Sequence, residues 1–127
     1  VELRMLCCRI RKGHPMKRAL AGCRAWVSGL RREQAPSRAA LRVAEPDGES
    51  GALKLSPLAA WTEAEVWAEV RRRDIPVNRL HAAGYPSIGC APCTRAVKPG
   101  EDPRSGRWWW EKPSQAKECG LHPPGRT

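Results

Sequence analysis

The stretch SIGCAPCT, residues 87–94, decides how the second half of the chain can fold. From residue 84 onward Gly, Pro, Cys and Arg dominate and the hydrophobic periodicity disappears, so this region cannot bury a core of its own. It must be held by a metal, by a ligand or by packing against the rest of the chain. Two thiols in a C-x-x-C turn can bind one metal ion or cluster, or form a redox disulfide.

A second cysteine pair, Cys7-Cys8, lies 90 − 8 = 82 residues before Cys90. Two pairs supply four thiolates, enough for a tetrahedral zinc ion or an iron–sulfur cluster. Adjacent cysteines are awkward ligands for one small ion, whereas a cubane presents four separate iron corners. The residues therefore favour an iron–sulfur cluster over zinc. A C-x-x-C knuckle with an unrelated buried cysteine pair is the structural alternative.

The fifth thiol, Cys119, lies in the polar stretch KECGLH, residues 117–122. A thiol in an exposed tail is free to attack a substrate and then to reach a second protein. The neighbouring Lys117 and His122 favour the thiolate, and Glu118 acts in the opposite direction. A dangling terminal thiol is the alternative. The sixth, Cys23, falls inside a helical pattern among small apolar residues, which predicts a core thiol.

Composition narrows the class of protein. The 127 residues carry a net charge of 23 − 13 = +10 and have a pI near 10, which favours anionic partners. The sequence shows no signal peptide and no apolar stretch long enough to cross a membrane. It starts with Val1, so we expect a piece of a longer protein. Six cysteines in two tight pairs and two singles favour a reducing compartment, the cytoplasm, over a disulfide scaffold.

Local patterns predict a mixed α/β fold of modest size, one domain at most, richer in helix and loop than in sheet. In the first sixty residues we expect a helix beginning at Pro15, a charged loop and a hairpin. The expected strand is 25–27 and the charged loop is 30–34. The hairpin consists of the strand 40–44, the turn 45–51 and the strand 52–55, with Lys54 and Ser56 facing away from Leu53 and Leu55.

The clearest helix begins at Thr62, where Thr62 and Glu65 form a capping box. Val66, Trp67 and Val70 give it one apolar stripe, and arginines at 71–73 close it. A short helix over 78–83 is expected after Pro76. Six Trp without Phe indicate that several tryptophans are core residues.

Arginines on Gly-containing loops are suited to bidentate recognition of phosphate or sulfate. Candidate cations are Lys12 close to the first cysteine pair, Arg31 and Arg32 after the first strand, and Arg104 and Arg107 before the WWW run at 108–110. Basic residues interleaved with aromatic ones can also bind single-stranded nucleic acid by stacking, provided that the tryptophans are exposed. Ordinary surface charge is the third reading.

Five stretches together resemble one family. They are CCRIRK (7–12), WVSGLRREQ (26–34), SIGCAPCT (87–94), GRWWWE (106–111) and ECGLH (118–122). In this order they resemble the C-terminal half of the assimilatory sulfonucleotide reductases, specifically the adenosine 5′-phosphosulfate (APS) reductases. The resemblance covers residues 7–122, nearly the whole chain.

The resemblance implies reduction of APS to sulfite and AMP, in sulfate assimilation and cysteine biosynthesis. It implies that Cys119 attacks the sulfur of APS and forms an S-sulfocysteine, which thioredoxin or a glutaredoxin-like dithiol then cleaves. It also implies a [4Fe-4S] cluster that acts electrostatically and structurally. The implied cluster ligands are Cys7, Cys8, Cys90 and Cys93, and the implied substrate-binding residues are Lys12, Arg31, Arg32, Arg104, Arg107 and His122.

The resemblance further implies the C-terminal part of an adenine-nucleotide-hydrolase-like (PAPS reductase-like) α/β domain. Residues 1–112 would form the partial catalytic domain and 113–127 a mobile tail that carries the nucleophile. Nothing in the chain matches the family's N-terminal phosphate-binding loop, so we expect the 127 residues alone to be inactive. After Gln34 the chain has Ala35, where the family usually has a hydroxyl residue.

Three alternatives remain open at this point. The first is a reductase of the 3′-phosphorylated substrate (PAPS), although cluster-bearing members of the family mostly use APS. The second is a non-catalytic, metal- or cluster-bearing nucleic-acid-binding module, and the third is an inactive remnant of the reductase. Under the favoured reading the partners are APS, AMP and a dithiol donor, with a homo-oligomer expected and neither a membrane nor a nucleic acid involved.

Overall fold

The computed structural model describes residues 2–111 and Glu118. The chain divides into two compact units. Residues up to Ala68, together with Glu118, belong to the first unit, and residues from Glu69 to 111 belong to the second. The predicted tail boundary at residue 113 lies outside the described residues.

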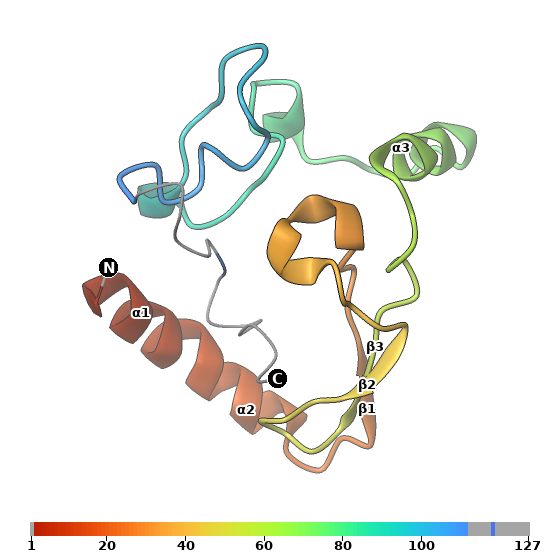
Figure 1. Ribbon diagram of the computed structural model, residues 1–127, viewed down its shortest axis with the longest axis vertical. Helices are drawn as coiled ribbons and strands as arrows, with labels where there is room; N and C mark the ends of the chain where they lie inside the picture. The colour runs from red at the N-terminus through yellow and green to blue at the C-terminus, as the bar shows by residue number, and fades with distance from the viewer. Residues whose placement is uncertain (1, 112–117, 119–127) are drawn as a thin grey trace. The chain divides into compact units, whose positions relative to one another are not determined.

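The first unit begins with a helix interrupted by a π-helical turn. Helix α1 (Glu2–Cys8) and helix α2 (His14–Leu20) flank the π turn Arg9–Gly13, and Figure 1 shows them as one continuous rod. The predicted helix at Pro15 is confirmed, but it reaches much further back. A proline inside a helix clashes with the carbonyl four residues earlier, and the wider π turn before Pro15 relieves this constraint.

The helix ends before Cys23, so the prediction of a core thiol at this position is wrong. Gly22 takes the left-handed conformation (φ +82°), and the backbone N–H of Cys23 donates to the carbonyl of Leu20 at 2.9 Å. This is a glycine-terminated helix end, which places Cys23 outside the helix. Its side chain is exposed.

A mixed three-stranded sheet follows, in the order β1-β3-β2 (Figure 1). Strand β3 (Leu53–Leu55) pairs in parallel with β1 (Ala25–Val27) and antiparallel with β2 (Ala44–Pro46). This confirms the mixed α/β class, the strand 25–27 and the hairpin. The predicted strand at 40–44 and the turn starting at 45 are wrong, because the second strand begins only at Ala44 and continues through the proline of an edge strand.

The small core of the first unit explains that shift. Leu41 is buried with Leu30 and Ala59, so it serves the core from a turn rather than from a strand. The face of β3 that carries Leu53 and Leu55 is not the more deeply buried of its two faces. Leu53 is largely exposed, whereas Ser56 just after the strand is fully buried and shares a 3.0 Å hydrogen bond with the hydroxyl of Ser28.

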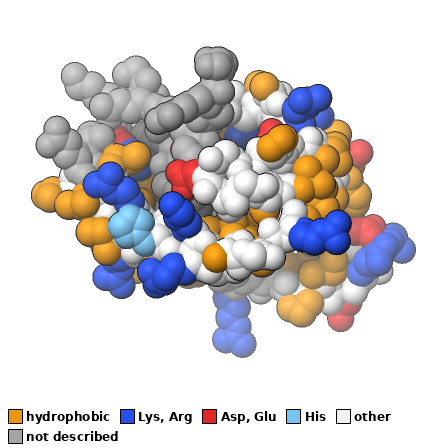
Figure 2. Space-filling view, turned by 90° about the horizontal axis from the view of Figure 1, so that it is seen from below, with side chains coloured by type: hydrophobic (Ala, Val, Ile, Leu, Met, Phe, Trp, Pro, Cys, Tyr) orange, Lys and Arg blue, Asp and Glu red, His pale blue; other side chains and the backbone are white. Residues whose placement is uncertain are grey.

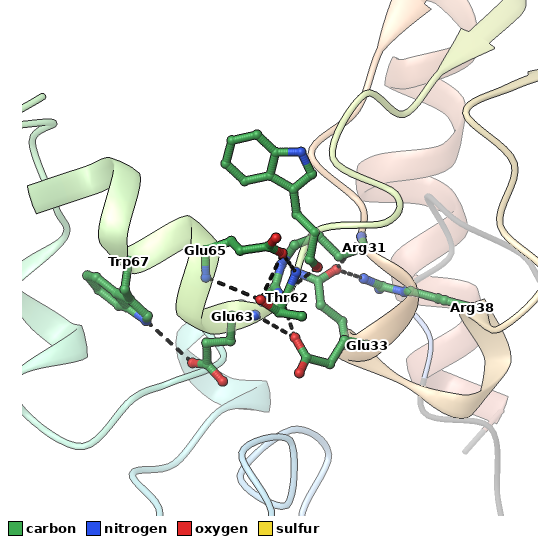
Figure 3. Close-up of polar contacts among 9 residues, drawn as sticks. Arg31, Glu33, Arg38, Thr62, Glu63, Glu65 and Trp67 are labelled. Atoms are coloured by element: carbon green, nitrogen blue, oxygen red, sulfur yellow. Dashed lines mark hydrogen bonds and ion pairs between the residues drawn. The ribbon is translucent and has the colours of Figure 1, made fainter. Parts of the chain in front are cut away.

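Helix α3 (Glu63–Arg72) confirms the predicted capping box (Figure 3). The Glu65 carboxylate accepts from the backbone N–H of Thr62 at 2.7 Å and from its hydroxyl at 2.8 Å, and the N–H of Glu65 donates back to that hydroxyl. A second acceptor comes from far along the chain, since the Glu33 carboxylate accepts from the backbone N–H of Glu63 at 2.5 Å. The loop around Glu33, here called the 30s loop (residues 30–34), is thereby fixed to the start of α3.

Short 3₁₀ turns make up much of the rest. They lie at Arg32–Gln34 and Pro36–Arg38 in the first unit, and at Arg79–His81 and Ala91–Cys93 in the second. Within the described residues that follow α3, the β pairing is a single bridge between Thr94 and Arg107. The predicted loop-rich character after residue 84 is therefore confirmed. Among the described residues no helix is long and apolar enough to span a bilayer.

The cap of α3 should contribute measurably to stability. We expect Thr62→Ala to lower the free energy of unfolding by about 1 kcal/mol, because one early N–H group loses its hydroxyl acceptor. Thermal unfolding of the full-length protein measures the change, and Thr62→Ser, which keeps the hydroxyl, is the control. Equal melting temperatures for all three proteins would contradict the assignment.

The same cap should weaken in acid. The backbone N–H of Thr62, and secondarily its hydroxyl, hold the pKa of Glu65 below its usual value of 4.5. A carboxyl group with a lowered pKa stabilises the fold above its unfolded pKa and loses that contribution as the pH falls through the folded value. The destabilisation caused by Glu65→Gln should therefore be present at neutral pH and shrink below about pH 4, as a melting series against pH would record.

Candidate functional site

The first cysteine pair ends helix α1. Cys7 is exposed and Cys8 is buried, as expected for neighbours that project about 100° apart on a helix. The π turn that follows contains Lys12. Turns of this kind often occur at functional sites, and this one places Lys12 shortly after the thiol pair.

The second pair forms a tight knuckle in the second unit. Cys90 precedes the 3₁₀ turn, and the backbone N–H of Cys93 donates to the carbonyl of Cys90 at 2.8 Å. The hydroxyl of Thr94 donates to the same carbonyl at 3.0 Å. The N–H of Trp108 then donates to the carbonyl of Cys93 at 3.0 Å, which joins the knuckle to the WWW segment.

A buried arginine lies against this knuckle. Arg107 is 7% exposed, and its Nη1 donates to the carbonyl of Ile88 at 3.0 Å and to the Ser87 hydroxyl at 3.4 Å. Its guanidinium carbon lies 4.5 Å from the centroid of the Trp108 ring, a cation–π contact. A Cβ on Gly89 would meet that carbon at 2.4 Å, so the glycine leaves the space that the guanidinium fills.

Gly106 is fixed by a similar constraint. A Cβ there would lie 2.3 Å from the backbone carbonyl oxygen of Arg95, whose own N–H donates to the carbonyl of Gly106 at 3.0 Å. Because backbone cannot move aside as a side-chain tip can, this close approach excludes a larger residue. The two glycines thus let the segment 104–111 lie directly against the knuckle.

The donor set fits an iron–sulfur cluster. Cys7, Cys8, Cys90 and Cys93 belong to no disulfide, and thiolate sulfur is the ligand that such clusters use. Within the described residues no three His, Cys, Asp or Glu side chains surround a common point suited to a metal ion. Each unit therefore offers a pair of thiols, and their convergence on one cluster stays a prediction.

The predicted cations differ in the hydrogen bonds and ion pairs that they make with the rest of the fold. Nη1 of Arg31 pairs with the Glu33 carboxylate at 2.9 Å and donates to the carbonyl of Trp61 at 3.3 Å (Figure 3), and Nε of Arg32 donates to the carbonyl of Leu41 at 2.8 Å. The backbone N–H of Arg104 donates to the Asp102 carboxylate at 2.8 Å. Figure 2 shows lysines and arginines at several places on the face that it draws.

The residue before the candidate nucleophile is firmly held in the first unit. Glu118 is buried, and its carboxylate accepts from the guanidinium of Arg38 and from the hydroxyl of Ser37. Cys119 and His122 themselves lie outside the described residues. Their predicted roles as nucleophile and substrate-binding residue are not tested by the structure.

Comparison with known proteins decides the family. The model of the phosphoadenosine phosphosulfate reductase domain matches residues 2–96. The chain belongs to this domain family. The predicted resemblance is thereby confirmed at the level of the family.

Curated relatives are similar over nearly the whole chain. The adenosine 5′-phosphosulfate reductase of Burkholderia cepacia is 62% identical over 122 residues, which are 96% of this chain and 48% of that protein. The proteins of the same name from Allochromatium vinosum and Rhizobium meliloti (strain 1021) are 60% and 54% identical, over 96% and 98% of this chain and 47% and 46% of their own lengths. The chain thus spans about half the length of the curated relatives it matches.

The tryptophan prediction holds only in part for this family member. Trp108 is 1% exposed, but Trp109 and Trp110 are exposed and form an edge-to-face pair with ring centroids 5.4 Å apart. Exposed aromatic rings meet one requirement of the nucleic-acid alternative. The family match favours the reductase reading over that alternative.

Sequence reasoning missed three contributors to the site: Gly89, Glu33 and the pair of Arg38 with Glu118. The family resemblance quoted Gly89, Glu33 and Glu118 inside its motifs without giving any of them a role. The spacing of 80 residues between Arg38 and Glu118 carries no periodic signal, and a glycine beside a cysteine does not reveal an arginine packed on it.

The packing of Arg107 on Gly89 can be tested with a double-mutant cycle. We expect Gly89→Ala to cost about 1–3 kcal/mol by overpacking, and to cost much less when Arg107 is already alanine. Urea unfolding of the full-length protein, followed through tryptophan fluorescence, gives the four free energies. Gly106→Ala is the comparison, and its cost should persist with Arg107 replaced. Additive effects of the Gly89 and Arg107 substitutions would disprove the contact.

Proposed function

We propose that the full-length protein containing this chain reduces APS to sulfite and AMP in sulfate assimilation, a step towards cysteine biosynthesis. The observation that carries the proposal is the 62% identity, across 96% of the chain, to a protein named adenosine 5′-phosphosulfate reductase. Both cysteine pairs and the ECG motif at 118–120 support it, because they supply the thiols that the chemistry needs.

In the first step the thiolate of Cys119 attacks the sulfur atom of the substrate's sulfonate group. A sulfur–sulfur bond forms, the bond from sulfur to the bridging phosphate oxygen breaks, and AMP leaves with the electron pair. The product is an S-sulfocysteine on Cys119. Nucleophilic catalysis of this kind divides a difficult transfer into two easier steps.

A thiolate and a sulfonucleotide repel each other, so fixed positive charge must surround the reacting atoms. Arginine recognises phosphate and sulfate oxygens in a bidentate manner. We assign this work to six residues, of which Arg107 also supports the knuckle. They are Lys12, Arg31, Arg32, Arg104, Arg107 and His122.

In the second step a dithiol protein of the thioredoxin or glutaredoxin class regenerates the enzyme. Its first thiolate attacks the Cys119 sulfur, sulfite leaves, and a mixed disulfide forms. The second donor thiol resolves this disulfide and releases Cys119 as a thiol. The donor is oxidised to a disulfide by two electrons, and the substrate sulfur is reduced by two.

A [4Fe-4S] cluster would be held by the thiolates of Cys7, Cys8, Cys90 and Cys93. It would support the structure and supply local charge, and it would not relay electrons. The two pairs favour APS over PAPS as the substrate. Cysteines that form no disulfide are suited to the cytoplasm, where disulfides are rare. A homo-oligomer of the full-length protein completes the proposal.

The nucleophile can be identified by mass. We expect full-length protein mixed with APS and no dithiol to gain one sulfonate group on Cys119, and to lose it when thioredoxin is added. Cys119→Ser should abolish both the adduct and sulfite release, because a hydroxyl is a far weaker nucleophile than a thiolate. Cys23→Ser, which removes an exposed thiol, should behave as wild type. An adduct on any other residue would refute the assignment.

Iron content tests the ligand set. Each of Cys7→Ser, Cys8→Ser, Cys90→Ser and Cys93→Ser should lower iron and acid-labile sulfide in anaerobically purified protein, since a hydroxyl is a poor ligand for an iron–sulfur cluster. Cys23→Ser is again the matched control and should keep the wild-type iron content. Wild-type protein without iron and sulfide, or equal losses in the control, would exclude this cluster assignment.

A further inference from the structure

A charged contact bridges 80 residues of sequence within the first unit. Arg38 Nη2 donates to Glu118 Oε2 at 2.8 Å, and Arg38 Nε donates to Oε1 at 2.9 Å, the fork geometry of a bidentate arginine–carboxylate pair. The hydroxyl of Ser37 donates to Oε1 at 2.7 Å. The side chains of Arg38 and Glu118 are only 11% and 5% exposed, so this is a buried pair.

A third contact comes from helix α1. Arg4 Nη1 donates to the backbone carbonyl oxygen of Glu118 at 3.0 Å. Arg4 and Cys8 are four residues apart and therefore lie on one face of the helix. Glu118 is thus held through its carboxylate by the turn Pro36–Arg38, and through its backbone by the helix that carries the first cysteine pair.

We propose that Glu118 is a positioning residue, and that Arg38, Ser37 and Arg4 form an anchor that fixes where the adjacent Cys119 thiol stands. The inference rests on the proposed role of Cys119 as the nucleophile. Consecutive Cα atoms are about 3.8 Å apart, so fixing Glu118 at three points confines the attachment of the next residue. Confinement of a nucleophile favours the geometry of attack.

The charge balance of the anchor is consistent with this role. A carboxylate directly before a thiolate would repel both the thiolate and an anionic substrate. The guanidinium of Arg38 lies on that carboxylate and offsets its charge, so Glu118 can anchor the chain without adding an uncompensated negative charge beside the thiol. An exposed glutamate would lack this compensation.

Trypsin digestion gives a direct readout, because cleavage after Lys117 and Arg126 yields a peptide with Cys119 as its single cysteine. Cleavage after Arg18 and Arg24 yields another, with the exposed Cys23 as an internal reference. Full-length protein is pulsed with iodoacetamide before denaturation and digestion. The ratio of alkylation rates at Cys119 and Cys23 then reports how firmly the segment is held, whether or not the protein turns over APS.

We expect Glu118→Gln and Arg38→Gln each to raise this ratio by roughly tenfold, because each breaks the charge-assisted hydrogen bonds of the anchor. The exchanged pair Arg38→Glu with Glu118→Arg should bring the ratio back towards wild type. The matched controls Arg42→Gln and Glu49→Gln alter exposed residues of the same unit and should change nothing. Formation of the Cys119 sulfonate from APS should slow in the two single variants and recover in the exchanged pair.

Unchanged ratios in both single variants would overturn the anchor. So would a rise with Glu118→Gln and a fall with Arg38→Gln, because that pattern is a charge effect on the thiol without any anchoring. Absence of a sulfonate on Cys119 in wild-type protein would instead refute the proposed function. The alkylation ratios would still decide whether Glu118 holds its neighbour.

Discussion

The cysteine knuckle of the second unit depends on one guanidinium group packed against a residue without a side chain. Arg107 fills the space over Gly89, donates to the carbonyl of Ile88 and stacks on Trp108. After α3 the described residues of this unit hold no further helix longer than a 3₁₀ turn, so packing between larger elements cannot shape the loop. The buried guanidinium of Arg107, which donates to the Ile88 carbonyl, shapes the loop instead and brings positive charge to the knuckle.

The first unit also depends on charged side chains, and here they are carboxylates. Its apolar core is small and consists of Leu30, Leu41 and Ala59. Two carboxylates join further segments that lie far apart in the sequence. Glu33 caps α3 from the 30s loop, and Glu118 returns to Arg38 from far along the chain. A buried ion pair contributes little net stability but is costly to break, because the surviving charge is left without its partner. Such pairs specify position more than they add stability.

Local signals in the sequence were sufficient for part of this structure. The capping box at Thr62 and Glu65 and the strand 25–27 follow from neighbouring residues and are confirmed. The strand at 40–44 failed because the demand of the core for Leu41 overrode the alternating pattern, and the core position of Cys23 failed because Gly22 ends the helix first. The contacts of Arg38 and Arg107 join distant segments, and no local pattern encodes them.

The π turn Arg9–Gly13 determines how this chain would respond to the loss of a residue. The N–H of His14 bonds to the carbonyl of Arg9, five residues back, so the segment holds one residue more than a regular α-helix would. Removing one residue there would restore the α-helical register and rotate everything before it by about 100° about the axis. Cys7 and Cys8 would then face different neighbours although no cysteine had been replaced. A single-codon deletion in this turn is therefore a more severe lesion than most substitutions in it.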